Sequence, residues 1–505
     1  MFAFSAGLIL LFIVATLANI DAAEATFNTV RDGITRRFGW FLILSVQGFL
    51  LFCVYLALSR FGHIRIGGPG ARPDFSAFSW FAMLFAAGMG IGLMFWSVAE
   101  PILHLQNPPG ATGMTIAGAQ RAMDLTFLHW GFHVWGIYAL VGLSLAYFTF
   151  NRGLPLTIRS AFYPLLGNRI QGPLGHIIDT LAVIATMFGL ATSLGLGVSQ
   201  INAGLNAVFG ISFGSGAQLL LIAAITALAT ASVASGLERG IRLLSLTNLY
   251  AAIVLLVFLL LVGPTLFLFK NLVQSTGHYL QNLLTLGSWT ETYSRDESWQ
   301  GSWTIFYWAW WIAWSPFVGM FIARISKGRT VREFVLGVLF VPSLLTFVWV
   351  SVFGGAAIYE TLFVDTSIVE AANNNVATAL FELLMRFPLA DVTVLLAVLL
   401  VAIFFVTSCD SGSLVMDILT SGGRLDSPVL QRVFWAVLSG VVAAVLMVGG
   451  GLAALQTASI STGLPFAVVL VLMAWCLLKA FREEMPAMSY RAAKAMYCDD
   501  DENGR

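Results

Sequence analysis

Charged side chains are scarce in this sequence: Asp, Glu, Lys and Arg make up 10% of its 505 residues. A soluble protein of this length needs far more charge to keep its surface hydrated, so this scarcity excludes an ordinary soluble domain. Acidic and basic residues balance at 26 each, which predicts no nucleic-acid partner. The four cysteines have neither metal-ligand nor disulfide spacing, so they indicate no such site.

Long apolar runs fill most of the chain instead. Hydrophobic residues make up 58% of it, and the mean hydropathy is +0.85. Because a bilayer core needs about 20 mostly apolar residues per helix, the runs predict an all-α polytopic membrane protein with twelve transmembrane helices. The first run lacks the positive flank of a signal peptide, so we interpret it as a membrane helix. The expected helices are 2–19, 39–58, 78–97, 128–150, 177–206, 217–234, 246–269, 302–325, 331–353, 391–420, 433–450 and 462–480.

Basic residues in the short loops predict the orientation, because cytoplasmic loops carry the excess of Lys and Arg. They gather in the even-numbered loops, which places both termini in the cytoplasm. One loop disagrees with this orientation. It lies between the first two helices, on the predicted outer side, and yet carries arginines. The loops after the second and eighth helices hold Arg60, Arg65, Arg72, Arg324, Lys327, Arg329 and Arg332, and the disagreeing loop holds Arg31, Arg36 and Arg37.

Two of the predicted outer connections are long, 270–301 and 354–390. Both contain stretches with one apolar and one polar face, which predicts amphipathic helices along the outer surface. The C-terminal segment, 481–505, is short and polar, and we expect it to be a cytoplasmic tail. No stretch of the sequence suggests a nucleotide-driven motor.

Glycines at every second position interrupt the third expected helix, at Gly88, Gly90 and Gly92. Each glycine costs a helix about 1 kcal/mol relative to alanine. One interpretation is close helix packing through small residues. The other is an unwound segment in mid-membrane, where free backbone carbonyls bind a cation or a substrate, as in the broken helices of secondary transporters.

Tryptophans are dense in the eighth expected helix, and the fourth helix supplies a second aromatic set. Some of these rings belong to interfacial belts, and ordinary packing accounts for any single one. Rings that converge from two helices, however, predict a box for a cation that cannot donate hydrogen bonds, such as a trimethylammonium group, at up to about 2 kcal/mol per contact. The two sets are Trp310, Trp311 and Trp314, and Trp130, Trp135 and Tyr138.

Polar residues interrupt the tenth expected helix at Thr407, Ser408, Asp410 and Ser411. Hydroxyls in membrane helices commonly bond their own backbone, but an intramembrane Asp is costly and indicates function. Oxygen ligands with little formal charge suit sodium, so we expect a cation site shared with the glycine stretch. The helix is long enough to break at 411–413.

Two further features are interpreted as structural. His129 and His133 are four residues apart on the fourth helix, a spacing that could bind a metal, but we expect no Glu or Cys to join them in a metal site. Glu100 directly precedes Pro101, which we expect to stop the third helix.

These segments resemble the betaine/choline/carnitine transporter (BCCT) family, and the resemblance covers nearly the whole chain. The tryptophan run of the eighth helix is highly specific to that family. The matching segments are Gly88 to Gly92 and on to Glu100-Pro101, His129 to Trp135, Trp303 to Arg329, and Thr407 to Gly412.

The resemblance implies a LeuT-like core of two inverted five-helix repeats, 78–269 and 302–480, after two peripheral helices in 1–77. It also implies alternating access, a homotrimer in lipid, and a place in the bacterial inner (plasma) membrane. Carried over by position, the substrate site is Trp130, Trp135, Tyr138, Trp310, Trp311 and Trp314 with Gly88, Met89 and Gly90. A sodium site draws on Ala86, Met89, Phe404, Thr407 and Ser408.

The same resemblance places a possible second sodium site at Thr186 and Phe317. Leu190 stands where a further threonine of that site is expected, which leaves the number of sodium ions open. The resemblance implies that choline carriers of the family have an Asp at the position of Gly92, so Gly92 favours a zwitterion or another substrate that needs no counter-charge. Sodium-independent carnitine exchangers are expected to replace the hydroxyl of Ser408, so its presence favours sodium coupling.

The sequence therefore predicts a sodium-coupled symporter of a zwitterionic onium solute, glycine betaine or dimethylsulfoniopropionate. Sodium-independent exchange of carnitine-like or betaine-like solutes, and choline uptake, stay open as alternatives. A membrane enzyme would need a nucleophile–base pair or a metal cluster, and the motifs supply neither. We expect no catalytic residue, and no cofactor or metal besides the coupling sodium ion.

Overall fold

The computed structural model describes residues 1–235, 238–294, 298–424 and 426–502, and nearly all of them are helical. In these ranges the β structure is one isolated bridge, between Arg65 and Thr330. The all-α class is therefore confirmed. The α-helices are α1 (Phe2–Ala18), α2 (Ile20–Leu58), α3 (Ala77–Gly88), α4 (Ile91–Gln106), α5 (Ile116–Trp130), α6 (Phe132–Phe150), α7 (Tyr163–Leu166), α8 (Pro173–Phe209), α9 (Ser215–Ser235), α10 (Glu238–Val262), α11 (Thr265–Gly287), α12 (Ser298–Ser302), α13 (Thr304–Ile325), α14 (Val331–Phe363), α15 (Ser367–Asn374), α16 (Ala379–Leu384), α17 (Ala390–Thr420), α18 (Val429–Val448) and α19 (Gly451–Glu502), with 3-10 turns η1 (Arg60–His63), η2 (Ile158–Phe162), η3 (Gly167–Gln171) and η4 (Val376–Thr378).

The helices have the length and composition of a multi-pass membrane protein. Within the described ranges ten are long and apolar enough to cross a bilayer, or eleven if the bent pair α3 and α4 is one span. α1 is also apolar but shorter, with 17 residues. Each expected apolar run lies largely on helix in the structure. The count of twelve spans and the inverted repeat stay predictions.

The third expected span is broken, as the second interpretation of the glycine stretch predicts. α3 ends at Gly88, α4 begins at Ile91, and the two helices are bent by 59° relative to each other. Met89 and Gly90, which join them, have extended backbone. The break therefore frees backbone groups in the middle of the molecule, which a continuous helix would have used for its own hydrogen bonds.

The expectation that Pro101 stops this helix is wrong. α4 continues through Pro101 to Gln106. A proline is tolerated inside a membrane helix when neighbouring helices accommodate it, and a Cβ at Gly354 of α14 would lie 2.7 Å from Pro101 Cγ. Glu100 consequently lies inside α4 rather than at its end.

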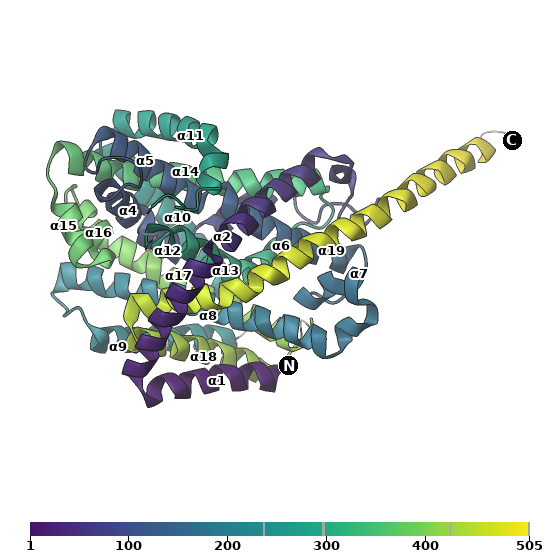
Figure 1. Cartoon of the computed structure of the whole chain (residues 1–505), viewed down its shortest axis with the longest axis horizontal. Helices are drawn as coiled ribbons and strands as arrows, with labels where there is room; N and C mark the ends of the chain where they lie inside the picture. The colour runs from purple at the N-terminus through teal and green to yellow at the C-terminus, as the bar shows by residue number, and fades with distance from the viewer. Residues whose placement is uncertain (236–237, 295–297, 425, 503–505) are drawn as a thin grey trace.

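Several helices are longer than the apolar runs that predict them, because a helix that leaves the membrane can continue with polar residues. α2 begins at Ile20 instead of 39, where the Asn19 side chain accepts the Ala22 backbone N–H at 3.0 Å. The three arginines of the disagreeing loop therefore lie on α2. Figure 1 shows α2 crossing the body and α19 extending beyond it.

Some of the other boundaries differ in the same sense, and some do not. α19 begins at Gly451 instead of 462 and continues through most of the expected tail, and α14 continues to Phe363. α10, by contrast, ends at Val262, before the turn that precedes α11. α17 is one continuous helix, so the suggested break at 411–413 is wrong.

Helices lie in both long connections, as predicted from their mixed faces. α11 packs against α5 and α14 (Figure 1), and α15 and α16 follow α14. Arg386, just after α16, binds Glu360 at 3.0 Å and Ser367 Oγ at 2.5 Å and also pairs with Asp365. The Ser367 backbone N–H, and after it Arg386, hold the pKa of Asp365 below its usual value. These bonds fasten the connection to the end of α14.

The centre of the molecule is built from helices that approach one another closely through glycine. α8 packs against α17, α18, α19 and α13, and α13 packs in turn against α6 and α19. A Cβ at Gly319 of α13 would lie 2.5 Å from Val141 Cγ1 of α6. This packing brings α13, α6, α8 and α17 around the break between α3 and α4.

Candidate functional site

A cavity of about 650 Å³ lies at the break between α3 and α4. This volume is in the range of small-molecule sites, which are mostly apolar with few polar groups. The lining includes all but one of the residues predicted to bind substrate or sodium, although α3, α5, α13 and α17 are far apart in the sequence. These lining residues are Ala86, Gly88, Met89, Gly90, Trp130, Trp135, Tyr138, Trp310, Trp311, Trp314, Phe317, Phe404, Thr407 and Ser408.

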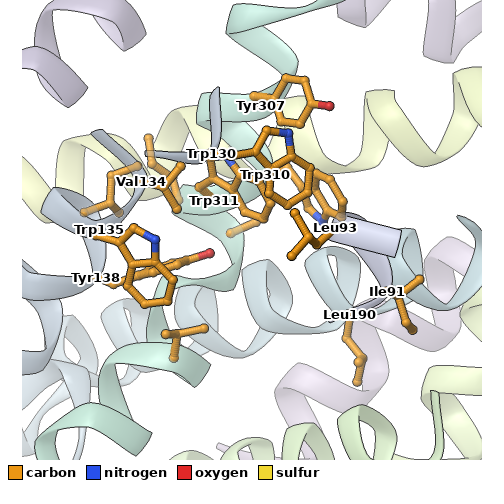
Figure 2. Close-up of a cluster of buried hydrophobic side chains, with 14 of the residues drawn as sticks. Ile91, Leu93, Trp130, Val134, Trp135, Tyr138, Leu190, Tyr307, Trp310 and Trp311 are labelled. Atoms are coloured by element: carbon orange, nitrogen blue, oxygen red, sulfur yellow. The ribbon is translucent and has the colours of Figure 1, made fainter. Parts of the chain in front are cut away.

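Three of the predicted aromatic rings form one contiguous wall. Trp310 and Trp311 of α13 stack at 4.6 Å between centroids, with 14° between their planes. Trp130, the last residue of α5, meets Trp311 edge-on at 4.9 Å and Trp310 at 6.4 Å (Figure 2). We call these three rings the tryptophan wall. They present large electron-rich surface to the cavity.

The other predicted rings lie beside this wall. Trp135 and Tyr138, one turn apart on α6, contact each other at 5.3 Å and are seen together in Figure 2, apart from the tryptophan wall. Trp314 lies one turn after Trp310 and contacts Phe317 at 5.0 Å. The structure thus brings all six predicted rings to one cavity, but in separate groups.

Most of the indole N–H groups are bonded to protein. Trp311 Nε1 donates to the His129 carbonyl at 2.9 Å, and Trp314 Nε1 donates to the Gly189 carbonyl at 2.7 Å. Trp130 Nε1 donates to a carboxylate at 2.7 Å. Trp135 differs, because its Nε1 is buried and has no hydrogen-bond partner among the described residues. The bonded rings turn their faces, not their polar edges, to a ligand.

Gly92 lies where two rings of the wall meet the first turn of α4. A Cβ at this position would lie 2.7 Å from Trp310 Cη2 and 3.0 Å from Trp130 Cη2, so any side chain here displaces a ring. Overpacking of this kind costs about 1–3 kcal/mol. We expect Gly92→Ala to raise the KM for the transported solute about tenfold, measured by uptake into proteoliposomes. Gly48→Ala on α2, where a Cβ meets nothing within 4 Å, is the control; equal KM values in both variants would contradict the prediction.

The predicted sodium residues lie on both sides of the helix break. Ala86 and Met89 come from its α3 side, and Phe404, Thr407 and Ser408 from the middle of α17. The Ala86 carbonyl accepts only a long hydrogen bond, 3.3 Å from the Met89 N–H. Thr407 Oγ1 donates to the Ile403 carbonyl at 3.0 Å, which leaves its lone pairs for a cation. These oxygen donors fit a hard, weakly charged cation such as sodium.

The residues named for a second sodium site do not share one surface. Phe317 lines the cavity, whereas Thr186 is buried on α8 and is not part of its lining. Thr186 Oγ1 donates to the Ala182 carbonyl at 2.8 Å. Leu190 fills the space between α8 and α17, because a Cβ at Gly412 would lie 2.7 Å from Leu190 Cδ2.

The described lining of the cavity has a single charged side chain, which lies at one end. Among its described lining residues Arg324 is the one charged side chain, and no Asp or Glu is present. Arg324 belongs to the last turn of α13. The lining continues there to Phe75, just before α3, and to Ser245 of α10. The cavity therefore extends from the tryptophan wall toward the end of α13 that carries the predicted cytoplasmic basic loop.

The expectation that no Glu joins the two histidines is wrong for His129. His129 does have a carboxylate partner, since Glu100 Oε1 lies 2.6 Å from His129 Nδ1. His133 instead bonds Gln47, at 2.7 Å, so the two histidines do not form a pair. An intramembrane Glu is costly and by default indicates function, so the sequence did contain a signal that Glu100 is more than the residue before a proline.

Glu100, His104 and His129 place one ligand atom each within 4.8 Å of one another, as in a metal site. The carboxylate, however, already accepts hydrogen bonds from Trp130 and Tyr307, at 2.7 and 2.5 Å, besides contacting both imidazoles. Four donors saturate its two oxygens. The cluster therefore fits a hydrogen-bonded anchor better than a metal centre.

Comparison with known proteins decides the family. The family model described as "BCCT, betaine/carnitine/choline family transporter" matches residues 1–486. The chain belongs to this family. It is a membrane transporter rather than an enzyme, as the aromatic and glycine motifs predict.

Relatives described as glycine betaine transporters are similar to this chain over nearly its whole length. A glycine betaine transporter of Acinetobacter baylyi is 46% identical over 95% of this chain and 73% of the relative. In Vibrio parahaemolyticus, "Glycine betaine transporter 1" is 47% identical over 96% of this chain and 93% of the relative. A "Glycine betaine/proline/choline/ectoine transporter" of the same organism is 46% identical over 96% and 87%.

Among solved structures, a manganese transporter of Eremococcus coleocola aligns with a TM-score of 0.40 and 15% identity. The alignment covers 79% of this chain and 81% of that one. Similarity at this level supports no conclusion about the site.

Proposed function

We propose that this BCCT transporter carries a zwitterionic onium solute, glycine betaine in the first place, in symport with sodium. One observation supports this above the others: the cavity is walled by tryptophan and tyrosine rings but has no Asp or Glu among its described lining residues. Aromatic faces attract a methylated cation without donating or accepting hydrogen bonds. A substrate with net positive charge would have no counter-charge here, whereas a zwitterion brings its own.

The carboxylate of such a solute needs donors, and the cavity offers two kinds. Trp135 supplies a buried indole N–H that has no partner among the described residues, and a buried donor left unpaired costs about 1–3 kcal/mol. The break at Met89 and Gly90 supplies backbone that lines the same cavity. A carboxylate bound between them would pair the Trp135 N–H, which is otherwise buried without compensation.

The position of the predicted cation ligands supports the proposal of sodium coupling. They join the broken span to α17, so a bound sodium ion would stabilise the unwound backbone that also meets the solute. An ion couples to transport only when it favours one conformational state over another, and a ligand set divided between two helices has that property. We propose one sodium ion per cycle, because Leu190 occupies space beside Gly412 and Thr186 lies away from the cavity.

The one-sided extension of the cavity supports alternating access. It continues to Arg324 and Phe75, at the end of the molecule where the basic loops are predicted to face the cytoplasm. Near the opposite end of α13, the rings of Trp96, Trp303 and Tyr307 form a cluster with centroids 5.4 to 6.4 Å apart. We propose that this arrangement is the inward-facing state of a plasma-membrane carrier with cytoplasmic termini.

Uptake of labelled glycine betaine into proteoliposomes, with and without an inward sodium gradient, tests the proposal. We expect uptake that requires the gradient and is competed by unlabelled zwitterionic onium solutes more strongly than by choline. Dimethylsulfoniopropionate competing better than betaine would identify the sulfonium solute as the substrate. Exchange that is indifferent to sodium would instead support the carnitine-type or betaine-type exchanger, and strong competition by choline would overturn the zwitterion preference.

A further inference from the structure

A buried carboxylate lies directly behind the tryptophan wall. Glu100 of α4 is fully buried and does not line the cavity. Its Oε2 accepts hydrogen bonds from Trp130 Nε1 at 2.7 Å and from the Tyr307 hydroxyl at 2.5 Å. Its Oε1 lies 2.6 Å from His129 Nδ1 and 3.2 Å from His104 Nε2. The carboxylate thus joins α4, α5 and α13 at one point.

These bonds constrain the orientation of the Trp130 ring. Trp130 is only 7% exposed, and a short hydrogen bond from its N–H to an ionised acceptor is about twice as strong as a neutral one. The bonded edge points toward Glu100, so the opposite edge and the ring face remain for the cavity. Rotation of the indole would break this bond and leave a buried carboxylate short of a donor, which is unfavourable.

His129 extends the support to a second ring of the wall. Its Nδ1 contacts Glu100, its Nε2 lies 3.0 Å from Thr304 Oγ1, and its backbone carbonyl accepts the Trp311 N–H at 2.9 Å. The imidazole also stacks on Tyr307 at 4.6 Å. His129, whose backbone carbonyl accepts the Trp311 N–H, is therefore itself held through its imidazole by Glu100.

We propose that Glu100 is a positioning residue for solute binding, which holds the Trp130 indole directly, and the Trp311 indole through His129, with their faces toward the cavity. The proposal rests on the function proposed above, since it concerns the affinity of the tryptophan wall for its solute. Glu100 itself does not touch the solute. Its carboxylate acts by fixing the geometry of rings that do.

Glu100→Met tests the proposal, because it removes both acceptors and keeps the length of the side chain. We expect E100M to raise the KM for glycine betaine at least tenfold, with Vmax per folded transporter within threefold of the unaltered protein. E100Q should recover most of the affinity. Its amide oxygen can accept from Trp130 and Tyr307, while its NH₂ donates to an imidazole nitrogen, since neutral histidine can present either nitrogen as an acceptor.

A double-mutant cycle separates positioning from a general effect on folding. Trp130→Phe keeps an aromatic ring but has no N–H for Glu100 to hold, so in the W130F background the KM effect of E100M should shrink at least threefold. If the effects of E100M and W130F on KM instead multiply in the double variant, the proposal is overturned, because Glu100 then acts independently of Trp130. Should E100M fail to fold, E100D enters the same cycle, since it keeps the charge but withdraws the carboxylate from the indole.

Asp124→Asn is the matched control. Asp124 is a buried carboxylate on α5, the helix of Trp130, and it bonds His278 of α11 at 2.7 Å away from the cavity. We expect D124N to leave the KM within twofold of the unaltered protein; a rise as large as that of E100M would overturn the proposal. If the unaltered protein takes up glycine betaine and E100M does so with the same KM, this inference alone is overturned. If the unaltered protein takes up no onium solute, the proposed function is overturned and this inference with it.

Discussion

Replacing Trp311 with leucine is expected to lower the affinity for the onium solute about 30-fold. The Trp311 ring lies in the middle of the tryptophan wall, stacked on Trp310 at 4.6 Å and touched edge-on by Trp130 at 4.9 Å. A desolvated cation–π contact contributes about 2 kcal/mol, and each 1.4 kcal/mol corresponds to about tenfold in affinity. Equilibrium binding of labelled glycine betaine to the purified transporter measures the change directly.

Trp349→Leu is the control for the loss of a large buried ring outside the cavity. Trp349 of α14 is buried, stacks on Phe353 at 4.4 Å and does not line the cavity. We expect this variant to reduce the yield of folded protein but to leave the affinity of the folded fraction unchanged. If Trp311→Leu binds betaine as tightly as the unaltered protein, the tryptophan wall is not the site of the methylated head.

Removing the hydroxyls of Thr407 and Ser408 is expected to raise the half-saturating sodium concentration at least tenfold. Hydrogen bonds and contacts to a charged group contribute about 1.5–3 kcal/mol each, and a hard cation in a partly apolar cavity has few replacement ligands. Thr407→Val and Ser408→Ala keep the volume of each side chain nearly constant. The sodium dependence of betaine uptake, recorded for each variant at fixed betaine, gives the half-saturating concentration.

Ser411→Ala supplies the comparison. Ser411 also lines the cavity from α17, close in sequence to the predicted ligands, but it is outside the proposed sodium site. We expect its loss to leave the sodium dependence unchanged. If all three variants raise the half-saturating sodium concentration equally, the hydroxyls act on the cavity in general. If none of them changes it, the sodium site does not include α17.

The broken span shows how far local sequence could predict the site. Glycine at 88, 90 and 92 weakens a helix regardless of its surroundings, so two interpretations were available from the residues alone. The tertiary structure combines them: the chain unwinds at Met89 and Gly90, while Gly92, already in α4, provides the close approach to Trp310 and Trp130. Which glycine served which purpose depended on neighbours from α5 and α13.

Helix boundaries illustrate the opposite case. Apolar runs locate the part of a helix that crosses lipid, so each expected span lies largely on helix, but the polar ends of α2 and α19 lie outside those runs. Pro101 was misleading for a similar reason. A local rule stops a helix at proline, whereas packing against Gly354 of α14 allows α4 to continue.

By itself, the sequence determined the class of the molecule, most of its spans and the residue types of its site. These properties depend on composition and on the spacing of residues along one helix, which are local. The tertiary structure alone decided which rings share a wall, that Thr186 lies apart from the cavity, and that Glu100 bonds His129 and Tyr307, which are 29 and 207 residues away. Such contacts arise from the packing of distant helices, and no local pattern specifies which buried donor will meet a buried carboxylate.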